Sequence, residues 1–265
     1  MTAPPLPILR LKPKADARRI RHGHPWAWAD DLVLDRRSKA IPAGALALLQ
    51  DANREPLGLG VASVEARIGL RLLDRNPEAV IDRAWMAAKI GRALALRSAL
   101  YDAPFYRLIH AEGDGLPGLI VDRFGDVLVM QPNAIWLEDR LEDLSAALMQ
   151  ATGCTTLIKN GTGRARAQEG LPEEMAVLAG TAPDAPIPVP MNGATYMADV
   201  MGGQKTGLFY DQRPNHNFAA GLAKGARVLD VFSHVGGFGL AALAGGAREA
   251  LAVDASAAAL ELAQA

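Results

Sequence analysis

The sequence has one cysteine, no long apolar run and no metal-ligand spacing. Cys154 is alone among 265 residues, which excludes an intramolecular disulfide and a metal site built from several cysteines. No apolar run approaches the roughly 18 residues that a membrane span needs, and the first residues lack the charged leader and apolar core of a secretory signal. The five histidines are scattered along the chain. These absences predict a cytoplasmic protein without a membrane segment or a metal.

The spacing of apolar runs and turns predicts three domains. Short apolar runs between residues 8 and 73 are separated by turn signals, as in a small β-domain. A helical period over residues 81–100 precedes strand-like segments with glycine turns, a helix over 137–149 and a strand over 155–159. This mixture is typical of an α+β domain. Because prolines are dense over residues 182–190, we expect a boundary there and domains at 1–75, 76–182 and 183–265.

Two turns dominate the last third of the chain. Asn192 and Gly193 form a strong hairpin signal, which predicts that residues 187–191 pair with residues 194–200. Residues 228–239, VLDVFSHVGGFG, form an apolar strand, a glycine-rich turn and the start of a helix, and a second apolar strand ends at Asp254. Glycines let a ligand approach the backbone, and a carboxylate that ends the next parallel strand can bind a ribose diol. This arrangement predicts a nucleotide-type cofactor site.

The glycine spacing favours S-adenosylmethionine over a dinucleotide. A dinucleotide loop requires G-x-G-x-x-G, whereas Gly236, Gly237 and Gly239 form G-G-x-G. Asp230 precedes this loop on the strand, where a carboxylate would repel a pyrophosphate but can receive the ammonium group of a methionine moiety. The alternative is a plain strand-to-helix turn in an α/β domain that binds no nucleotide. His234 is notable among the histidines because it lies inside the loop.

A polar segment over residues 202–216 precedes the cofactor strand. It carries more hydrogen-bonding side chains than a linker needs, so we expect it to fold over the bound ligand. The alternative is a solvated connector that caps a helix over about residues 215–223. The candidate contacts in this segment are Lys205, Thr206, Asp211, Gln212 and Arg213.

The N-terminal end is locally basic although the whole chain has a net charge of −1. Residues 10–39 hold nine lysines and arginines against four aspartates, a difference of five positive charges. Such patches bind phosphate backbones, and Trp26 and Trp28 could stack on unpaired bases. A solvated surface with tryptophans in a small core explains the same pattern, and charge alone does not separate the two. The candidate RNA contacts are Lys12, Lys14, Arg18, Arg19, Arg21 and Trp26.

Four blocks in order give the chain a resemblance to a known family. They are GHPW at 23–26, EGDGLPGLIVDRFGD at 112–126, GQKTGLFYDQR at 203–213 and VLDVFSHVGGFG at 228–239. Together they resemble the bacterial large-subunit rRNA 5-methylcytosine methyltransferases. The resemblance spans nearly the whole chain. It implies an α/β fold in which a PUA RNA-binding domain and a small central α+β domain precede a Rossmann-like catalytic domain that uses S-adenosylmethionine.

The resemblance also implies roles for particular residues. It places Asp254 on the ribose of the cofactor, and it favours RNA binding for the basic segment. The residues it places at the methionine end of the cofactor are Asp230, Phe232, Ser233, Gly236 and Gly237.

The chain departs from the family pattern in its last residues. Methylation of cytosine on carbon needs a nucleophile that first adds to the ring, and a cysteine thiolate suits this role. In the family, that cysteine and an Asp-Pro-Pro-type loop lie downstream of the strand that here ends at Asp254. Cys154 precedes a predicted strand of the middle domain, so we interpret it as a packed side chain. We therefore expect a chain that is cut within its last helix, lacks its catalytic half and is inactive alone.

The sequence thus predicts an S-adenosylmethionine-dependent methyltransferase of large-subunit rRNA. One rival function is methylation of a small molecule or protein, which would give no salt-dependent RNA affinity. Another is a non-catalytic RNA-binding protein on a degenerate methyltransferase fold, which would not bind the cofactor. A dehydrogenase is disfavoured by the glycine spacing. The sequence leaves open the target nucleotide, the methylated atom and the oligomeric state, including a homodimer.

Overall fold

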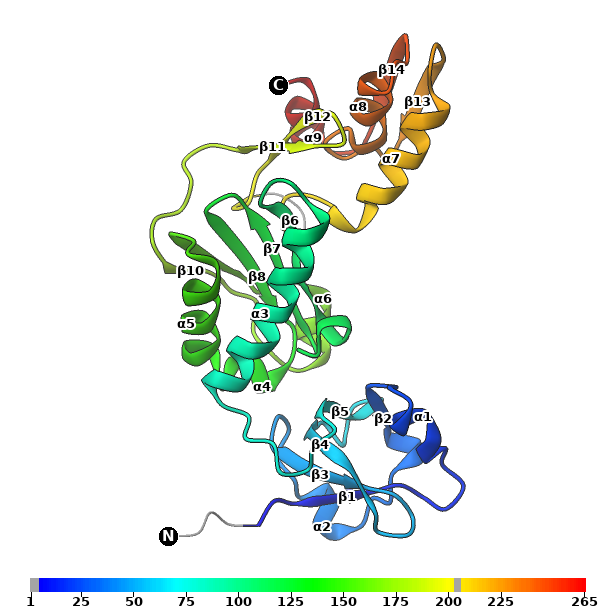
Figure 1. Cartoon of the computed structure of the whole chain (residues 1–265), viewed down its shortest axis with the longest axis vertical. Helices are drawn as coiled ribbons and strands as arrows, with labels where there is room; N and C mark the ends of the chain where they lie inside the picture. Colours follow the sequence, from blue (N-terminus) through cyan, green and yellow to red (C-terminus); the bar gives the residue numbers. More distant parts are fainter. Residues whose placement is uncertain (1–4, 203–205) are drawn as a thin grey trace.

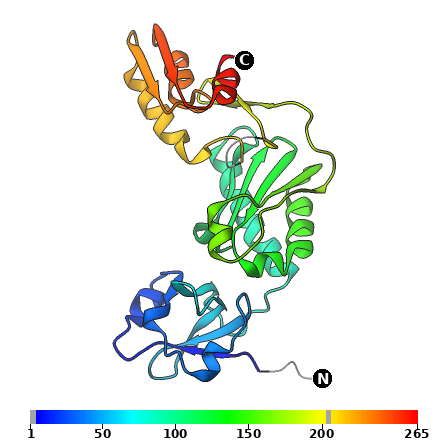
Figure 2. The same ribbon diagram turned by 180° about the vertical axis from the view of Figure 1, so that it is seen from behind.

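The computed structural model describes residues 5–202 and 206–265, which form three parts along the long axis of the molecule (Figure 1). An N-terminal sheet domain lies at one end and a sheet covered by two helices lies in the middle. The C-terminal strands and helices lie at the other end, and Figure 2 shows the same order from behind. The expected succession of a β-domain, an α+β part and an α/β part is therefore present.

The N-terminal domain is a five-stranded sheet in the order β1-β3-β4-β5-β2. Only β1 and β3 pair in parallel, and the other neighbours are antiparallel. Leu9, Leu49 and Leu70 have no exposed surface and form its core together with Ile20. Its elements are β1 (Ile8–Arg10), α1 (Ala17–Arg21), β2 (Trp26–Trp28), η1 (Ala29–Asp31), α2 (Arg36–Lys39), β3 (Leu46–Gln50), β4 (Pro56–Ala62) and β5 (Ile68–Asp74).

Helix α1 shows why the basic residues of this domain lie on its surface. Asp16 caps the helix, because its Oδ1 accepts a hydrogen bond of 3.0 Å from the backbone N–H of Arg18. Ile20 points into the core, whereas Arg18, Arg19 and Arg21 of the same helix are exposed. A single buried side chain thus orients three cations toward solvent.

The central sheet has the order β10-β9-β8-β7-β6, with β8 and β9 parallel and the other pairs antiparallel. Helices α3 and α5 cover one face, where Ile90 and Leu144 pack on Leu128 and Leu157. The predicted helix over 137–149 is instead two helices. The elements are α3 (Arg83–Leu100), β6 (Phe105–His110), η2 (Ala111–Asp114), β7 (Leu119–Phe124), β8 (Val127–Pro132), α4 (Ile135–Glu138), α5 (Leu141–Thr152), β9 (Thr156–Asn160), α6 (Arg164–Gln168) and β10 (Met175–Ala179).

The hairpin of β11 (Ile187–Met191) and β12 (Ala194–Ala198) packs with the opposite face of the central sheet. Its strands pair as the sequence predicts, because Asn192 and Gly193 both adopt the positive φ of a two-residue hairpin turn. Val129 and Ile158 of the sheet share one core with Val189 and Tyr196 of the hairpin. A continuous core therefore crosses residue 182, where we expected a boundary.

The C-terminal part is a parallel pair of strands with helices. It comprises η3 (Tyr210–Gln212), α7 (Arg213–Leu222), β13 (Arg227–Val231), α8 (Gly237–Ala244), β14 (Glu249–Val253) and α9 (Ala257–Gln264). Strands β13 and β14 pair in register, with Leu229 opposite Leu251 and Val231 opposite Val253. These four apolar side chains are exposed, whereas parallel sheets are usually covered on both faces. The carboxyl ends of both strands lead into loops that lie next to each other.

Among the helices of residues 5–202 and 206–265, none combines the length and apolarity that crossing a bilayer requires.

Ile158→Ala should destabilise the protein, because Ile158 has no exposed surface and joins the central sheet to the hairpin. We expect a loss of ~2–4 kcal/mol in the free energy of unfolding, measured by urea denaturation. Val177→Ala is the control, since Val177 pairs with Ile158 in the sheet but is 39% exposed, and it should cost about 0.5 kcal/mol. Equal losses in the two variants would contradict the shared core.

Candidate functional site

The glycine-rich loop after β13 favours glycine at two positions, for two different reasons. Gly236 has a φ of 77° and precedes α8 in the left-handed region. A Cβ at Gly237 would lie 2.7 Å from the imidazole ring of His216. The first glycine makes the turn and the second makes room for a histidine from α7. The turn thus brings α7 and α8 together at the end of β13.

The residues ahead of these glycines hold a strained backbone. Phe232 and His234 have φ values of 62° and 50°, which are uncommon for side chains of this size. The backbone N–H groups of Phe232 and Ser233 both donate to the carbonyl of Val253, at 2.8 and 3.1 Å. The loop is therefore tied to the end of β14, and Phe232 is 88% exposed.

Asp254 joins the two loops. Its Oδ2 accepts from the backbone N–H of His234 at 2.8 Å, and its Oδ1 accepts from that of Ser256 at 2.9 Å. The hydrogen bonds from Ser256 and His234 lower the pKa of Asp254, so the carboxylate is charged at neutral pH. Each carboxylate oxygen has a second lone pair that can accept from a ligand.

These loops and the segment before α7 enclose a cleft of about 480 Å³. It contains six of the predicted cofactor contacts, which are Asp211, Gln212, Phe232, Ser233, Gly237 and Asp254. His234, which was notable for its place in the loop, lies on the wall as well. The residues that the sequence did not suggest as contacts are Leu208, Phe209, His216, Val235 and Phe238.

The cleft is acidic and offers buried polar atoms. Asp211 and Asp254 lie on its wall, and the described residues of the wall include no lysine or arginine. Among the described residues, nothing hydrogen-bonds the buried Oγ of Ser233 or Nδ1 of His216. Buried polar atoms are rarely left unpaired in native proteins, so both atoms are suited to a polar ligand. The wall therefore favours a ligand that carries positive charge and hydrogen-bonding groups.

His216 is packed between aromatic rings. Its ring stacks on Tyr196 at a centroid distance of 6.5 Å and meets Phe238 edge-on at 4.5 Å. Burial lowers the pKa of His216, and the charges of Asp230 and Asp211 oppose this shift without reversing it. The ring is therefore neutral at pH 7.

Four predicted cofactor contacts in the described part of the chain lie outside the wall of the cleft, namely Asp230, Thr206, Gly236 and Arg213. Asp230 is 6% exposed and turns toward α8, where its Oδ2 accepts from the backbone N–H of Gly239 at 2.8 Å. This carboxylate stabilises the start of α8 instead of facing the cleft. Thr206 is fully buried, and its hydroxyl donates to Asp122 at 2.5 Å. Gly236 forms the turn before α8 but does not line the cleft. Lys205 lies outside the described residues.

The polar segment also attaches the start of α7 to the central domain. Arg213, a predicted contact, is not on the wall of the cleft, because its guanidinium lies 4.3 Å from the ring centroid of Tyr101. It also donates to the carbonyl of Phe105 at 3.0 Å, which fixes the start of α7 on the central domain.

The structure separates the predicted RNA contacts into two groups. Lys14 and Arg18 are exposed, and in the described part of the chain their side chains form no hydrogen bond or ion pair. The Nζ of Lys12 donates to the carbonyl of Asp30 at 2.8 Å, and Arg21 pairs with Asp51 at 2.5 Å. Arg19 lies 2.9 Å from the ring of His24. All five of these cations still lie on the surface of the N-terminal domain.

Trp26 differs from the expectation. Its indole N–H donates to Oε1 of Glu112 at 2.9 Å, so the side chain joins the N-terminal domain to the central domain. Its ring also meets Trp28 edge-on at a centroid distance of 5.5 Å. The half-buried indole therefore already has two contacts within the protein. The role of Trp26 in RNA binding stays a prediction.

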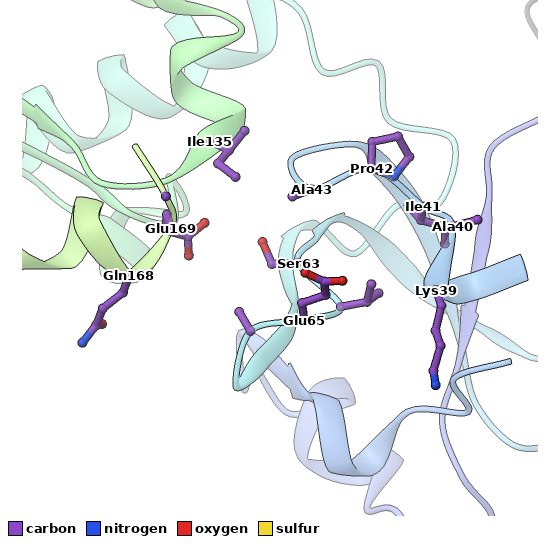
Figure 3. Close-up of a pocket in the computed structure, with 13 residues that line it drawn as sticks. Lys39, Ala40, Ile41, Pro42, Ala43, Ser63, Glu65, Ile135, Gln168 and Glu169 are labelled. Atoms are coloured by element: carbon purple, nitrogen blue, oxygen red, sulfur yellow. The ribbon is translucent and has the colours of Figure 1, made fainter. Parts of the chain in front are cut away.

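A second cleft of about 620 Å³ lies between the N-terminal and central domains (Figure 3). Ser63 and Glu65 lie on one side and Ile135, Gln168 and Glu169 on the other. Glu169 already pairs with Arg71 at 2.8 Å. This cleft lies between the surfaces of two domains. The described residues that line it include no group of reactive side chains.

No set of three or more His, Cys, Asp or Glu residues in the described part of the chain is arranged to hold a metal ion.

Two family models match different parts of the chain. A family model for a PUA-like domain matches residues 9–75, and one for S-adenosylmethionine-dependent methyltransferases matches residues 117–264. The chain belongs to the S-adenosylmethionine-dependent methyltransferase family. S-adenosylmethionine is thus the cofactor, and the expected fold class is confirmed.

Curated relatives are similar over nearly the whole chain. A "Ribosomal RNA large subunit methyltransferase" from Deinococcus radiodurans is 36% identical over 97% of this chain and 65% of its own length. A "Ribosomal RNA large subunit methyltransferase I" from Aliivibrio fischeri is 33% identical over 95% of this chain and 64% of its own length. The chain therefore spans somewhat less than two thirds of the length of these relatives.

Solved structures show the same fold. A protein from Streptococcus mutans assigned as a S-adenosylmethionine-dependent methyltransferase matches 98% of this chain and 66% of its own, with 20% identity and a TM-score of 0.81. A second solved protein, described as a methyltransferase and complexed with SAH, matches 98% of this chain and 65% of its own, also with 20% identity and a TM-score of 0.81. At this identity the likeness concerns the fold alone.

His216→Gln should flatten the acid side of the stability profile. The unfolded chain binds a proton at His216 near pH 6.5, whereas the lowered pKa delays protonation in the folded protein. Below pH 6.5 the unfolded state therefore binds more protons, and stability falls as pH falls. Urea denaturation across this range should show a shallower fall for His216→Gln than for the wild type. His22→Gln, which removes an exposed histidine, is the control. Identical slopes for the wild type and His216→Gln would contradict a buried neutral ring.

Proposed function

We propose that this chain carries the cofactor-binding and RNA-binding parts of a methyltransferase that forms 5-methylcytosine in large-subunit rRNA. The observation that carries the proposal is the acidic cleft at the carboxyl ends of β13 and β14, within a methyltransferase match, on a chain that also has a PUA-like domain. The names of the curated relatives support the rRNA substrate. The specific product rests on the resemblance of the four sequence blocks.

The cleft suits the cationic cofactor better than a dinucleotide. S-adenosylmethionine carries a sulfonium and an ammonium group, and the carboxylates of Asp211 and Asp254 attract positive charge. A pyrophosphate would meet the same carboxylates unfavourably. We assign Asp254 to the ribose hydroxyls, because it directly follows the second of two parallel strands. The assigned contacts with the rest of the cofactor are Asp211, Gln212, Phe232, Ser233 and Gly237.

When bound, the cofactor supplies an electrophilic methyl group. The residues of the cleft hold it and orient it, and the strained loop of Phe232 and His234 forms part of the wall. A base within a stacked helix cannot reach such a cleft, so the target nucleotide must be unpaired or flipped out.

Electrostatics supports RNA binding by the N-terminal domain. The exposed cations of α1 and of the segment before it lie on one domain, and phosphate backbones bind such surfaces with counterion release. Lys14 and Arg18 are the best candidates. Lys12, Arg19 and Arg21 share the surface but already have partners in the protein.

The nucleophile for cytosine is not Cys154. Its side chain is 6% exposed and belongs to the core under α5, whereas the acidic cleft is built by β13, β14 and α7. Because Cys154 is the one cysteine, we infer that residues 1–265 alone do not add a thiolate to cytosine. Incubation with rRNA and methyl-labelled cofactor should leave cytosines unlabelled.

Asp254→Asn should weaken binding of S-adenosylmethionine. An amide replaces one acceptor oxygen and removes the charge, so we expect about a tenfold higher Kd by calorimetry. Asp199→Asn is the matched control, because Asp199 also accepts from two backbone N–H groups but lies outside the cleft. A wild-type protein that fails to bind the cofactor, or that prefers a nicotinamide dinucleotide, would refute the assignment.

Lys14→Gln with Arg18→Gln should weaken RNA binding and its dependence on salt. Each lost phosphate contact should reduce the slope of log affinity against log salt by about 0.7 on single-stranded RNA. Fluorescence anisotropy with an rRNA fragment measures this slope. Arg83→Gln with Arg227→Gln removes two exposed cations from the other parts of the molecule and should leave it unchanged. An unchanged slope in the first pair would favour a methyltransferase of small molecules or proteins.

A further inference from the structure

A buried carboxylate in the central sheet is satisfied by residues from two parts of the chain. Asp122 on β7 has no exposed surface. Its Oδ1 accepts from Nε of Arg107 at 2.9 Å, and its Oδ2 accepts from a terminal nitrogen of Arg107 at 3.1 Å. The hydroxyl of Thr206 donates to the same Oδ2 at 2.5 Å. Arg107 lies on β6 of the central sheet, whereas Thr206 belongs to the segment before α7.

Arg107 also reaches toward the cofactor cleft. Its other terminal nitrogen lies 3.9 Å from Oδ1 of Asp211, a carboxylate on the wall of the cleft. The neighbours of Asp211 are fixed to the same sheet. The hydroxyl of Tyr210 donates to the carbonyl of Arg123 at 3.0 Å, and Arg213 holds the carbonyl of Phe105. The central sheet thus sets the position of the wall that Asp211 belongs to.

The side chains of Arg107, Asp122 and Asp211 together carry a net charge of −1, which a ligand can balance. Arg107 contributes one positive charge, and Asp122 and Asp211 contribute two negative charges. Asp122 is fully enclosed and forms the closer, two-hydrogen-bond pair with Arg107. The longer contact with Asp211 orients that carboxylate without neutralising it. A positively charged ligand in the cleft would complete the balance of charge.

We propose that Arg107 is a positioning residue of the cofactor site, which acts by holding Asp211 in place for the cationic cofactor. The inference rests on the proposed function, because it assigns S-adenosylmethionine to the cleft. It gives the central domain an indirect part in cofactor binding, through Asp211. Asp122 and Thr206 serve the same purpose one step further from the ligand, by fixing the guanidinium of Arg107.

A purely structural role is the alternative, and the protein offers a matched pair to separate the two. Arg97 forms a two-hydrogen-bond pair with Asp114 at 2.7 and 2.8 Å in the same domain, and both side chains are similarly buried. Arg97 even donates to the backbone carbonyl of Arg107 at 3.1 Å. It makes no ion pair with Asp211 in the described part of the chain. Any general disturbance of β6 should therefore also follow from replacing Arg97.

The experiment is a double-mutant cycle on cofactor affinity. Arg107→Lys keeps the charge but cannot pair with both carboxyl oxygens of Asp122 and also reach Asp211. Calorimetry gives the Kd of S-adenosylmethionine for the wild type, Arg107→Lys, Asp211→Asn and the double variant. The same set is measured with Arg97→Lys in place of Arg107→Lys. Thermal melting reports the stability of each variant, and Thr206→Val is a second, nearly isosteric probe of the network.

We expect Arg107→Lys and Asp211→Asn each to raise the Kd about tenfold, or ~1.4 kcal/mol, and the double variant to be no weaker than the worse single one. Arg97→Lys should lower the melting temperature as much as Arg107→Lys but leave the Kd within about twofold. Thr206→Val should raise the Kd in the same direction as Arg107→Lys.

Two results would overturn the inference. One is an unchanged Kd in Arg107→Lys, and the other is a double variant whose Kd rises by the product of the single effects. A wild-type protein that does not bind S-adenosylmethionine would instead overturn the proposed function itself.

Discussion

The arrangement of the C-terminal cleft depends on the burial of Asp122. A carboxylate without solvent costs several kcal/mol unless hydrogen bonds and an opposite charge compensate it. Arg107 and Thr206 provide both, but only if the segment before α7 lies against β7. Since that segment continues into Asp211, the same requirement fixes one wall of the cleft. The central sheet therefore supports the cofactor site as well as joining the terminal parts.

This dependence explains why the expected boundary near residue 182 does not separate two independent cores. Phe124, Val129 and Ile158 of the sheet pack with Tyr196 and Leu208 from beyond that boundary. The methyltransferase match likewise begins at residue 117, within the central sheet. Prolines mark where the chain leaves the sheet, but they do not reveal that it returns to the opposite face. The domain division remains a prediction.

Local features of the sequence were predictable, and long-range contacts were not. The hairpin at Asn192 and Gly193 follows from the backbone preferences of two adjacent residues. The loop around Gly237 follows from the strand, turn and helix pattern. In contrast, Thr206 contacts Asp122 over 84 residues and Trp26 contacts Glu112 over 86. No local sequence pattern encodes such pairs. From residue type alone we expected Thr206 and Trp26 to contact a ligand, whereas in the structure each has a hydrogen-bond partner within the protein.

The contact of Trp26 changes how RNA recognition should be divided under the proposed function. Trp26 begins a chain of contacts in which Glu112 and then Arg71 link the two domains, since Arg71 also pairs with Glu169. The aromatic side chain is thus used to orient the N-terminal domain. Under the proposed function, the exposed cations of that domain bind the RNA through its phosphates, irrespective of sequence. Under the same proposal, choice of the target base falls to the cleft, where the exposed Phe232 lies on the wall beside the cofactor residues.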